Sequence, residues 1–198
     1  MIKTVSPLKR PPAIFLKNLI FSLWLKDARF KLTRIRKYLA HNDRILEIGA
    51  GAGSVCTLLE AEGYKLTPLD VEDRTLTDHI KPVIYDGETI PYSEKSFDTA
   101  LILTVLHHTK DPARILSEAK RVAGNIIIIE DIYNNTFQQY LTYIFDSLFN
   151  FEFTGHPHSN KTDSEWKELF EALGLTLKGV RYDRFLFFFR QVTYYLEN

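Results

Sequence analysis

The sequence predicts an α/β protein with a doubly wound, mostly parallel sheet, and three observations support this prediction. Short β-branched runs alternate with amphipathic segments after residue 44, as in successive strand–helix–strand units. A glycine-rich turn at 49–53 follows the first of these runs. Residues 175–198 contain two strand-like runs with no helix between them, which indicates a C-terminal antiparallel hairpin.

Composition limits the class of protein. The 198 residues are 45% hydrophobic, enough to bury one core, and we expect residues 1–198 to form a single domain. Because 25 basic and 25 acidic residues cancel, no overall field attracts a nucleic acid, and a nucleic-acid partner is disfavoured. The one cysteine, Cys56, allows no internal disulfide, which suits a cytoplasmic protein. No apolar run reaches the roughly 18–20 residues that cross a bilayer.

The first elements are expected to be helical. Pro11 and Pro12 suit a helix start, and apolar residues recur at helical spacing as far as Leu39, so residues 1–40 are predicted to form a helical extension. The elements expected next are a strand at 44–48, a helix at 54–62 before Gly63, and strands at 65–70, 83–85 and 97–103.

The second half continues the alternation. Asp111 and Pro112 predict the start of a helix that runs to residue 122, and four consecutive isoleucines within 125–130 predict a strand buried on both faces. The remaining expected elements are a helix with a capping box at Thr162 and Glu165 that Gly174 ends, and a hairpin of 175–181 and 185–195 with its turn at 182–184.

The glycine turn is the strongest sign of a binding site. Gly49, Gly51 and Gly53 let the backbone turn sharply and let a ligand approach closely. A helix that begins at Ser54 would offer unpaired N–H groups to a carboxylate or phosphate. The sequence therefore predicts an anion-binding turn at the carboxyl end of the first strand.

A nicotinamide-dependent oxidoreductase is one alternative for such a turn. Dinucleotide-binding turns usually have the spacing G-x-G-x-x-G, whereas Ser54 occupies the sixth place here, which weakens that interpretation. Asp70 closes the next strand, 21 residues after Gly49, where a carboxylate can accept hydrogen bonds from ribose hydroxyls. An isolated strand-end aspartate is more often only solvated, and it is the neighbouring turn that favours the ribose role.

Residues 47–53 resemble the E/D-x-G-x-G-x-G motif of the class I methyltransferases, in particular the type-11 methyltransferase domain, which has a Rossmann-like fold. Residues 86–91 and 96–98 resemble that family's third and fourth motifs, and residues 106–112 resemble the segment after its fourth strand. The resemblance covers roughly residues 40–180. It implies a methyltransferase that depends on S-adenosylmethionine (SAM) as its cofactor.

The resemblance also implies roles for residues of this chain. Gly49 and Gly51 would line the methionine moiety of SAM, and Asp70 would bind the ribose. Asp86 would bind the adenine amino group, and the backbone at 103–104 would face the amino end. The expected cofactor-binding residues are Glu47, Gly49, Ala50, Gly51, Gly53, Asp70, Val71, Asp86, Gly87, Leu103 and Thr104.

Methyl transfer is an in-line displacement from a sulfonium, so the protein mainly aligns the acceptor and excludes water. A base helps where the acceptor is a hydroxyl or ammonium group, and the candidates are His108, which is preferred, Asp131 and His156. A structural role at a helix start is an equal alternative for His108. Glu130 and Asp131 would point to opposite faces of a strand, so at most one faces the site. No metal site is predicted from these residues.

The expected acceptor is a small molecule, apolar or aromatic. The resemblance places insertions over the acceptor pocket, so residues 135–162, with an apolar stripe at 137–149, are predicted to be a lid-like insertion. Core packing is the commoner role of such a stripe. Phe15, Phe21 and Trp24 would add a second wall. A SAM-binding module without transfer activity is a further alternative, because fold does not fix function.

Overall fold

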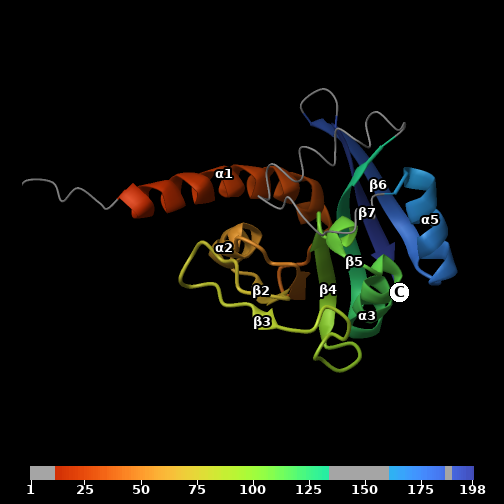
Figure 1. The fold of residues 1–198 in the computed structure, drawn as a ribbon. Helices are drawn as coiled ribbons and strands as arrows, with labels where there is room; N and C mark the ends of the chain where they lie inside the picture. The colour runs from red at the N-terminus through yellow and green to blue at the C-terminus, as the bar shows by residue number, and fades with distance from the viewer. Residues whose placement is uncertain (1–11, 134–160, 186–188) are drawn as a thin grey trace, which may run out of the picture.

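A central sheet with helices on both of its faces forms the computed structural model (Figure 1). The structure describes residues 12–133, 161–185 and 189–198. In this part of the chain the sheet has seven strands in the order β3-β2-β1-β4-β5-β7-β6. The predicted α/β fold, with a mostly parallel sheet and a C-terminal antiparallel hairpin, is confirmed.

The observed elements lie close to the expected ones. The helices are α1 (Pro12–Ile35), η1 (Arg36–Tyr38), α2 (Ser54–Ala61), η2 (Leu106–His108), α3 (Pro112–Val122) and α5 (Asp163–Ala172). The strands are β1 (Arg44–Ile48), β2 (Lys65–Asp70), β3 (Val83–Ile84), β4 (Phe97–Leu103), β5 (Ala123–Ile132), β6 (Thr176–Phe185) and β7 (Phe189–Glu197). The isoleucine strand is longer at both ends than the sequence indicated.

Parallel pairing brings four strand ends to one edge of the sheet. β1 pairs with β2 and β4, and β2 pairs with β3, all in parallel. The carboxyl ends of β1, β2, β3 and β4 therefore lie side by side. The polypeptide that follows each of these strands, including the glycine turn, is gathered at that edge.

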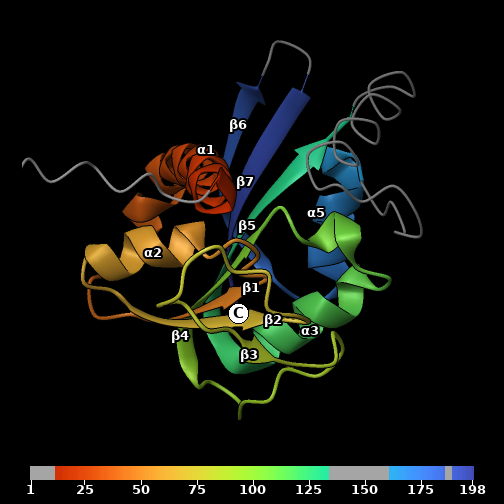
Figure 2. The same ribbon diagram turned by 60° about the vertical axis from the view of Figure 1, so that its left-hand side comes forward.

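Two apolar layers cover the sheet (Figure 2). One layer joins α3 and α5 to one face of the sheet, with Ile102 and Ile128 among its members. The other joins α1 and α2 to the opposite face, with Leu101 and Ile127. Side chains of consecutive strand residues enter different layers, as the alternation of a strand requires. The long apolar runs of β4 and β5 are explained by burial on both faces.

The hairpin turn predicted at 182–184 is wrong. These residues are strand residues, since Tyr182 pairs with Val192 and Asp183 with Gln191. The polar residues looked like a turn, but Asp183 is accommodated in the strand by cations. Its carboxylate oxygens lie 3.4 Å from Nε of Arg34 and 3.0 Å from Nη2 of Arg181. The strands therefore continue to residues 185 and 189.

In its described part, from residue 12, the N-terminal extension is one long helix followed by a short 3-10 turn. Ala28, Leu32 and Ile35 in the second half of α1 are buried against the sheet. Within the described residues, no helix is both long and apolar enough to span a bilayer. The cytoplasmic location stays a prediction.

The proposed lid-like insertion, 135–162, lies outside the described residues except at its end. There Thr162 caps α5 through the predicted capping box, with its hydroxyl accepting a hydrogen bond from the Glu165 N–H and its own N–H donating to the Glu165 carboxylate.

Candidate functional site

The glycine turn joins β1 to α2 at the carboxyl edge of the sheet. The N–H of Gly49 donates to the carbonyl of Leu69 at 2.8 Å, which ties the turn to β2. Gly49 has a φ of +79°, and a Cβ built there would lie 2.5 Å from Cγ2 of Val105. Gly51 also has a positive φ, of +49°, but a Cβ there would meet nothing within 4 Å. One glycine is therefore required by close packing, and the other borders open space.

Asp70 ends β2 beside this turn. Its Oδ2 accepts a hydrogen bond from the N–H of Gly51 at 2.8 Å, and its Oδ1 accepts one from the N–H of Val71 at 2.7 Å. The structure thus brings the predicted turn and the predicted acid together, although they are 19 residues apart in the sequence. The carboxylate is fixed at the edge where a ligand of the turn would lie.

Asp86 follows β3, the next strand along this edge. Its Oδ1 accepts hydrogen bonds from the N–H groups of Glu88 and Thr89, at 2.8 and 2.7 Å. These donors hold the pKa of Asp86 below its ordinary value, so the carboxyl is ionised at neutral pH. A Cβ on Gly87 would lie 3.2 Å from Cγ1 of Val71, so the loops after β2 and β3 touch.

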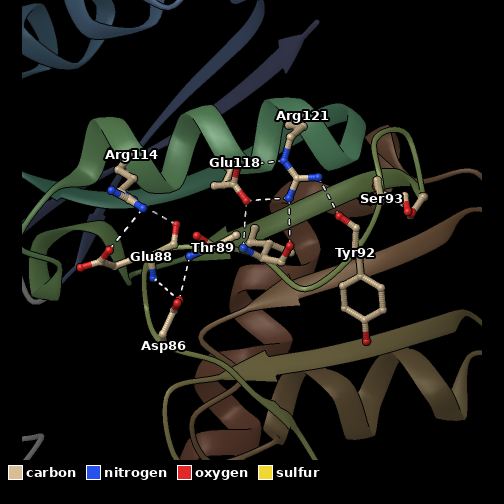
Figure 3. Close-up of polar contacts among 10 residues, drawn as sticks. Asp86, Glu88, Thr89, Tyr92, Ser93, Arg114, Glu118 and Arg121 are labelled. Atoms are coloured by element: carbon tan, nitrogen blue, oxygen red, sulfur yellow. Dashed lines mark hydrogen bonds and ion pairs between the residues drawn. The ribbon is translucent and has the colours of Figure 1, made fainter.

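Helix α3 holds the loop that follows Asp86 (Figure 3). Arg121 donates to the carbonyls of Ile90 and Tyr92, at 2.9 and 2.7 Å. Glu118, paired with Arg121 at 2.6 Å, accepts from the N–H of Ile90 at 2.9 Å. Sequence analysis missed this brace, because Glu118 and Arg121 look like an ordinary i,i+3 surface pair on a helix. Their effect is to fix the loop that carries Asp86.

At the end of β4 a buried lysine from α1 reaches the site. Nζ of Lys31 donates to Oγ1 of Thr104 at 2.9 Å and lies 2.9 Å from the Asp27 carboxylate. Lys31 is only 7% exposed. Thr104 has a φ of +62°, which is rare for a residue other than glycine. Sequence analysis missed Lys31, although its spacing, three residues after Ala28 and four before Ile35, places it on the buried side of the helix.

The side chains of Glu130 and Asp131, near the end of β5, point to opposite faces of the sheet. Glu130 is fully buried and accepts from the N–H groups of Val105 and Leu106, at 2.9 and 2.7 Å, and its other oxygen lies 2.6 Å from Nδ1 of His107. It therefore braces the loop after β4 from within the core. Asp131 lies on the α1 side, and its burial raises its pKa.

The three candidate bases have different positions. His108 is half-buried at the end of η2, and its ring lies 4.1 Å from the ring of His107, centroid to centroid. Asp131 lies near the end of β5, the strand next to β4. His156 lies outside the described residues.

Comparison with known proteins agrees with this geometry. Residues 46–125 match the family model of the methyltransferase domain. The demethylmenaquinone methyltransferase of Thermotoga maritima is 26% identical over 133 residues, which are 61% of this chain and 58% of that protein. An uncharacterized protein of Methanocaldococcus jannaschii, MJ1123, is 44% identical over 52 residues, a quarter of each chain. The chain thus aligns with less than two thirds of either relative.

Solved structures extend the similarity to the whole fold. A SAM-dependent methyltransferase of Thermotoga maritima superimposes with a TM-score of 0.67 at 19% identity, over 94% of this chain and 99% of that one. Residues 46–125 therefore match a methyltransferase domain, and the described fold is that of SAM-dependent methyltransferases.

The residues at the turn fit SAM, the cofactor of this family. Open space at Gly51 leaves room for a ligand against the backbone, which any side chain at that position would enter. Asp70 and Asp86 follow successive strands along the same edge and can accept hydrogen bonds from ribose hydroxyls and an amino group. The sequence thus predicted a set of residues that the fold places along a single edge.

Glu47 precedes the turn, and its side chain is buried beneath it. It is 3% exposed, and its carboxylate accepts a hydrogen bond from the thiol of Cys56 at 2.6 Å. Burial raises the pKa of Glu47 to about 7, an effect that the Cys56 hydrogen bond and the charge of Lys31 partly oppose. Burial also raises the pKa of Cys56, so the thiol keeps its proton. The Glu47 carboxylate is thus buried against α2, and its role in cofactor binding stays a prediction.

We expect the stability of Glu47→Gln, measured relative to the parent, to be greater at alkaline pH than at acid pH. When the pKa of a carboxyl is higher in the folded state, the protein becomes less stable as pH rises between the two pKa values. For Glu47 these are about 4.5 in the unfolded chain and about 7 in the folded protein. The glutamine variant does not titrate, so its free energy of unfolding relative to the parent should rise by about 2–3 kcal/mol between pH 4.5 and 8. Urea unfolding at both pH values measures this difference. Glu60→Gln, on the exposed side of α2, is the control, and an equal effect of pH on both variants would contradict the prediction.

Proposed function

We propose that this methyltransferase transfers a methyl group from SAM to a small, apolar or aromatic acceptor. The observation that carries the proposal is the hydrogen bond between Asp70 and the N–H of Gly51, because it joins the turn and the acid that SAM needs. SAM supplies a methyl group on a positively charged sulfur. The protein supplies binding, alignment and exclusion of water.

In this proposal, different residues of the site bind different parts of the cofactor. The backbone at Gly49 and Gly51 lines the methionine portion, and the N-terminus of α2 favours its carboxylate. Asp70 accepts hydrogen bonds from the ribose hydroxyls. Asp86, held ionised by two backbone donors, accepts a hydrogen bond from the adenine amino group. Thr104 closes the far side, where Lys31 holds its hydroxyl in place.

Asp131 is the favoured base. It lies on the same face of the sheet as Lys31, and its raised pKa makes it a better proton acceptor than an exposed carboxylate. SAM would supply the methyl group to the acceptor oxygen or nitrogen, and its sulfur would keep the electron pair of the broken carbon–sulfur bond as S-adenosylhomocysteine. Asp131 takes the proton that the acceptor loses. His108 is the second candidate for this role.

Two observations support an apolar or aromatic acceptor. A relative that aligns with 61% of this chain is named demethylmenaquinone methyltransferase. Phe21 and Trp24 on α1 are half-exposed and offer apolar contact surface. We therefore propose an acceptor with an apolar body and one polar atom that receives the methyl group.

Binding of S-adenosylhomocysteine, the product form of the cofactor, tests the proposal. At about a hundred times its dissociation constant this ligand should stabilise the parent by about 2.7 kcal/mol, a shift that thermal unfolding detects readily. Asp70→Ala removes the ribose acceptor and the brace of the turn, so the shift should be largely lost. NAD should give no shift with either protein.

Asp98→Ala is the matched control. Asp98 is an aspartate of the same sheet, but it pairs with Arg44 at 2.9 Å at the opposite, amino edge. This variant should keep the full response to S-adenosylhomocysteine. An equal response of Asp70→Ala and the parent, or stabilisation by NAD instead, would contradict the proposed cofactor site.

A further inference from the structure

A stripe of exposed apolar side chains runs along α1. Leu16, Leu19 and Leu23 are 56, 50 and 58% exposed, and Phe30 is 37% exposed. Their spacing of three, four and seven residues places them on one side of the helix. In the second half of α1 the buried side chains Ala28 and Leu32 lie on a different side, against the sheet. The amino-terminal half of the helix extends beyond the rest of the described fold (Figure 1).

The sequence up to residue 26 carries charges of one sign. The charged residues of the first 26 positions are Lys3, Lys9, Arg10, Lys17 and Lys26, with no acid among them. The first acid, Asp27, lies 2.9 Å from Nζ of Lys31 and is neutralised within the protein. Lys17, Lys26 and Arg29 are all exposed on α1, although Nζ of Lys17 lies 3.6 Å from the carboxylate of the fully exposed Asp78. An ion pair between exposed side chains is weak, so it leaves Lys17 able to contact another anion. Because the whole chain has no net charge, this basic segment is a local feature.

We propose that the outward face of α1 binds the surface of an anionic lipid bilayer, with the helix lying in the interface. A helix that combines an exposed apolar stripe with basic residues and few acids has the chemistry of an interfacial membrane helix. Leu16, Leu19 and Leu23 enter the boundary between headgroups and acyl chains. Lys17, Lys26 and Arg29 contact anionic headgroups. Within the described chain no helix meets the length and hydropathy of a span, which agrees with a helix that lies on the surface.

A second copy of the chain is a less favourable partner for this face. Two α1 helices packed through their leucine stripes would bring Lys26, which flanks the stripe, and other basic residues of the two copies into one interface. Like charges at such an interface repel. An anionic surface complements the same charges.

Sedimentation of the full-length protein with vesicles tests the inference. Vesicles of phosphatidylcholine with about 30% phosphatidylserine should sediment the protein, and binding should fall about tenfold or more when salt is raised, since screening weakens attraction to the headgroups. Phosphatidylcholine vesicles alone should bind far less. No methyl donor is present, so the result is independent of the proposed transfer reaction.

Two sets of substitutions separate the apolar and charged contributions. Combining Leu16→Ser, Leu19→Ser and Leu23→Ser should weaken binding to the anionic vesicles at least about tenfold. Combining Lys17→Gln, Lys26→Gln and Arg29→Gln should weaken it by a similar factor and reduce the dependence on salt. The charge variant keeps the inference testable if the serine variant does not fold.

Ile84→Ser is the matched control, because Ile84 is an apolar side chain with similar exposure, 52%, on β3. It should bind vesicles as the parent does. Either of two results overturns the inference. In the first, the parent fails to bind anionic vesicles. In the second, the parent does not bind vesicles and is a dimer in sedimentation equilibrium, which the leucine substitutions convert to a monomer.

Discussion

Replacing Gly49 with alanine is expected to abolish binding of S-adenosylhomocysteine and to lower the free energy of unfolding by about 3 kcal/mol. The new side chain would have to adopt a φ of +79°, which costs an L-residue about 1–2 kcal/mol. Its Cβ would also lie 2.5 Å from Cγ2 of Val105, so the loop after β4 must move away from the turn. That movement disrupts the surface on which the methionine portion is proposed to lie.

Two other glycine substitutions separate the causes. Gly63 follows α2, away from the turn, and has a φ of +87°. A Cβ built there would make only ordinary contacts, the nearest at 3.6 Å. Gly63→Ala should cost about 1–2 kcal/mol and leave binding intact. Gly51→Ala combines a similar strain with open space, so it should cost no more than Gly63→Ala but should lose binding. Urea unfolding and thermal shifts with the ligand measure the two effects.

The comparison between these variants decides the interpretation. If Gly51→Ala binds S-adenosylhomocysteine as tightly as the parent, the open space beside that backbone is not the ligand site. If Gly49→Ala is no less stable than Gly63→Ala, contact with Val105 does not matter to the fold.

Much of the fold followed from local sequence signals. The strand runs and the capping box at Thr162 each depend on residues within a few positions of one another, and these elements were placed to within a few residues. The turn and Asp70 were also predictable together, because successive parallel strands bring their carboxyl ends to one edge. Two site residues can be predicted together from the sequence when they follow successive strands that pair in parallel.

Features that depend on distant partners were not predictable in this way. Lys31 and Thr104 are 73 residues apart, and no local pattern joins a lysine of α1 to the end of β4. Asp183 looked like a turn residue because its cationic partner Arg34 lies on α1, far away in the sequence. Glu130 appeared as one of two possible bases, whereas its three donors all come from the loop after β4.

That loop connects Glu130 to the glycine turn. Glu130 fixes the N–H of Val105, and the Val105 side chain occupies the space that a side chain at Gly49 would need. The position of the turn, which follows β1, therefore depends on an acid that is buried on β5, two strands away in the sheet. Removing that acid should affect both the stability of the fold and the binding of its ligand.

Glu130→Ala is expected to lower the free energy of unfolding by about 4 kcal/mol and to weaken S-adenosylhomocysteine binding. The substitution leaves three donors, on Val105, Leu106 and His107, buried without their acceptor. It also creates a cavity where the side chain was fully enclosed. Without the brace, Val105 no longer holds its place against Gly49. Urea unfolding and ligand titration measure the two losses.

Glu130→Gln should retain most of the stability, because a carboxamide oxygen can still accept from the two backbone N–H groups that now share one carboxylate oxygen. Its NH2 group can donate to Nδ1 of His107 if the ring adopts the other tautomer. The expected cost is about 1–2 kcal/mol. Glu168→Ala, an exposed acid on α5, should change stability by no more than about 0.5 kcal/mol. Equal losses for Glu130→Ala and Glu130→Gln would mean that the negative charge, rather than the acceptor geometry, holds the loop in place.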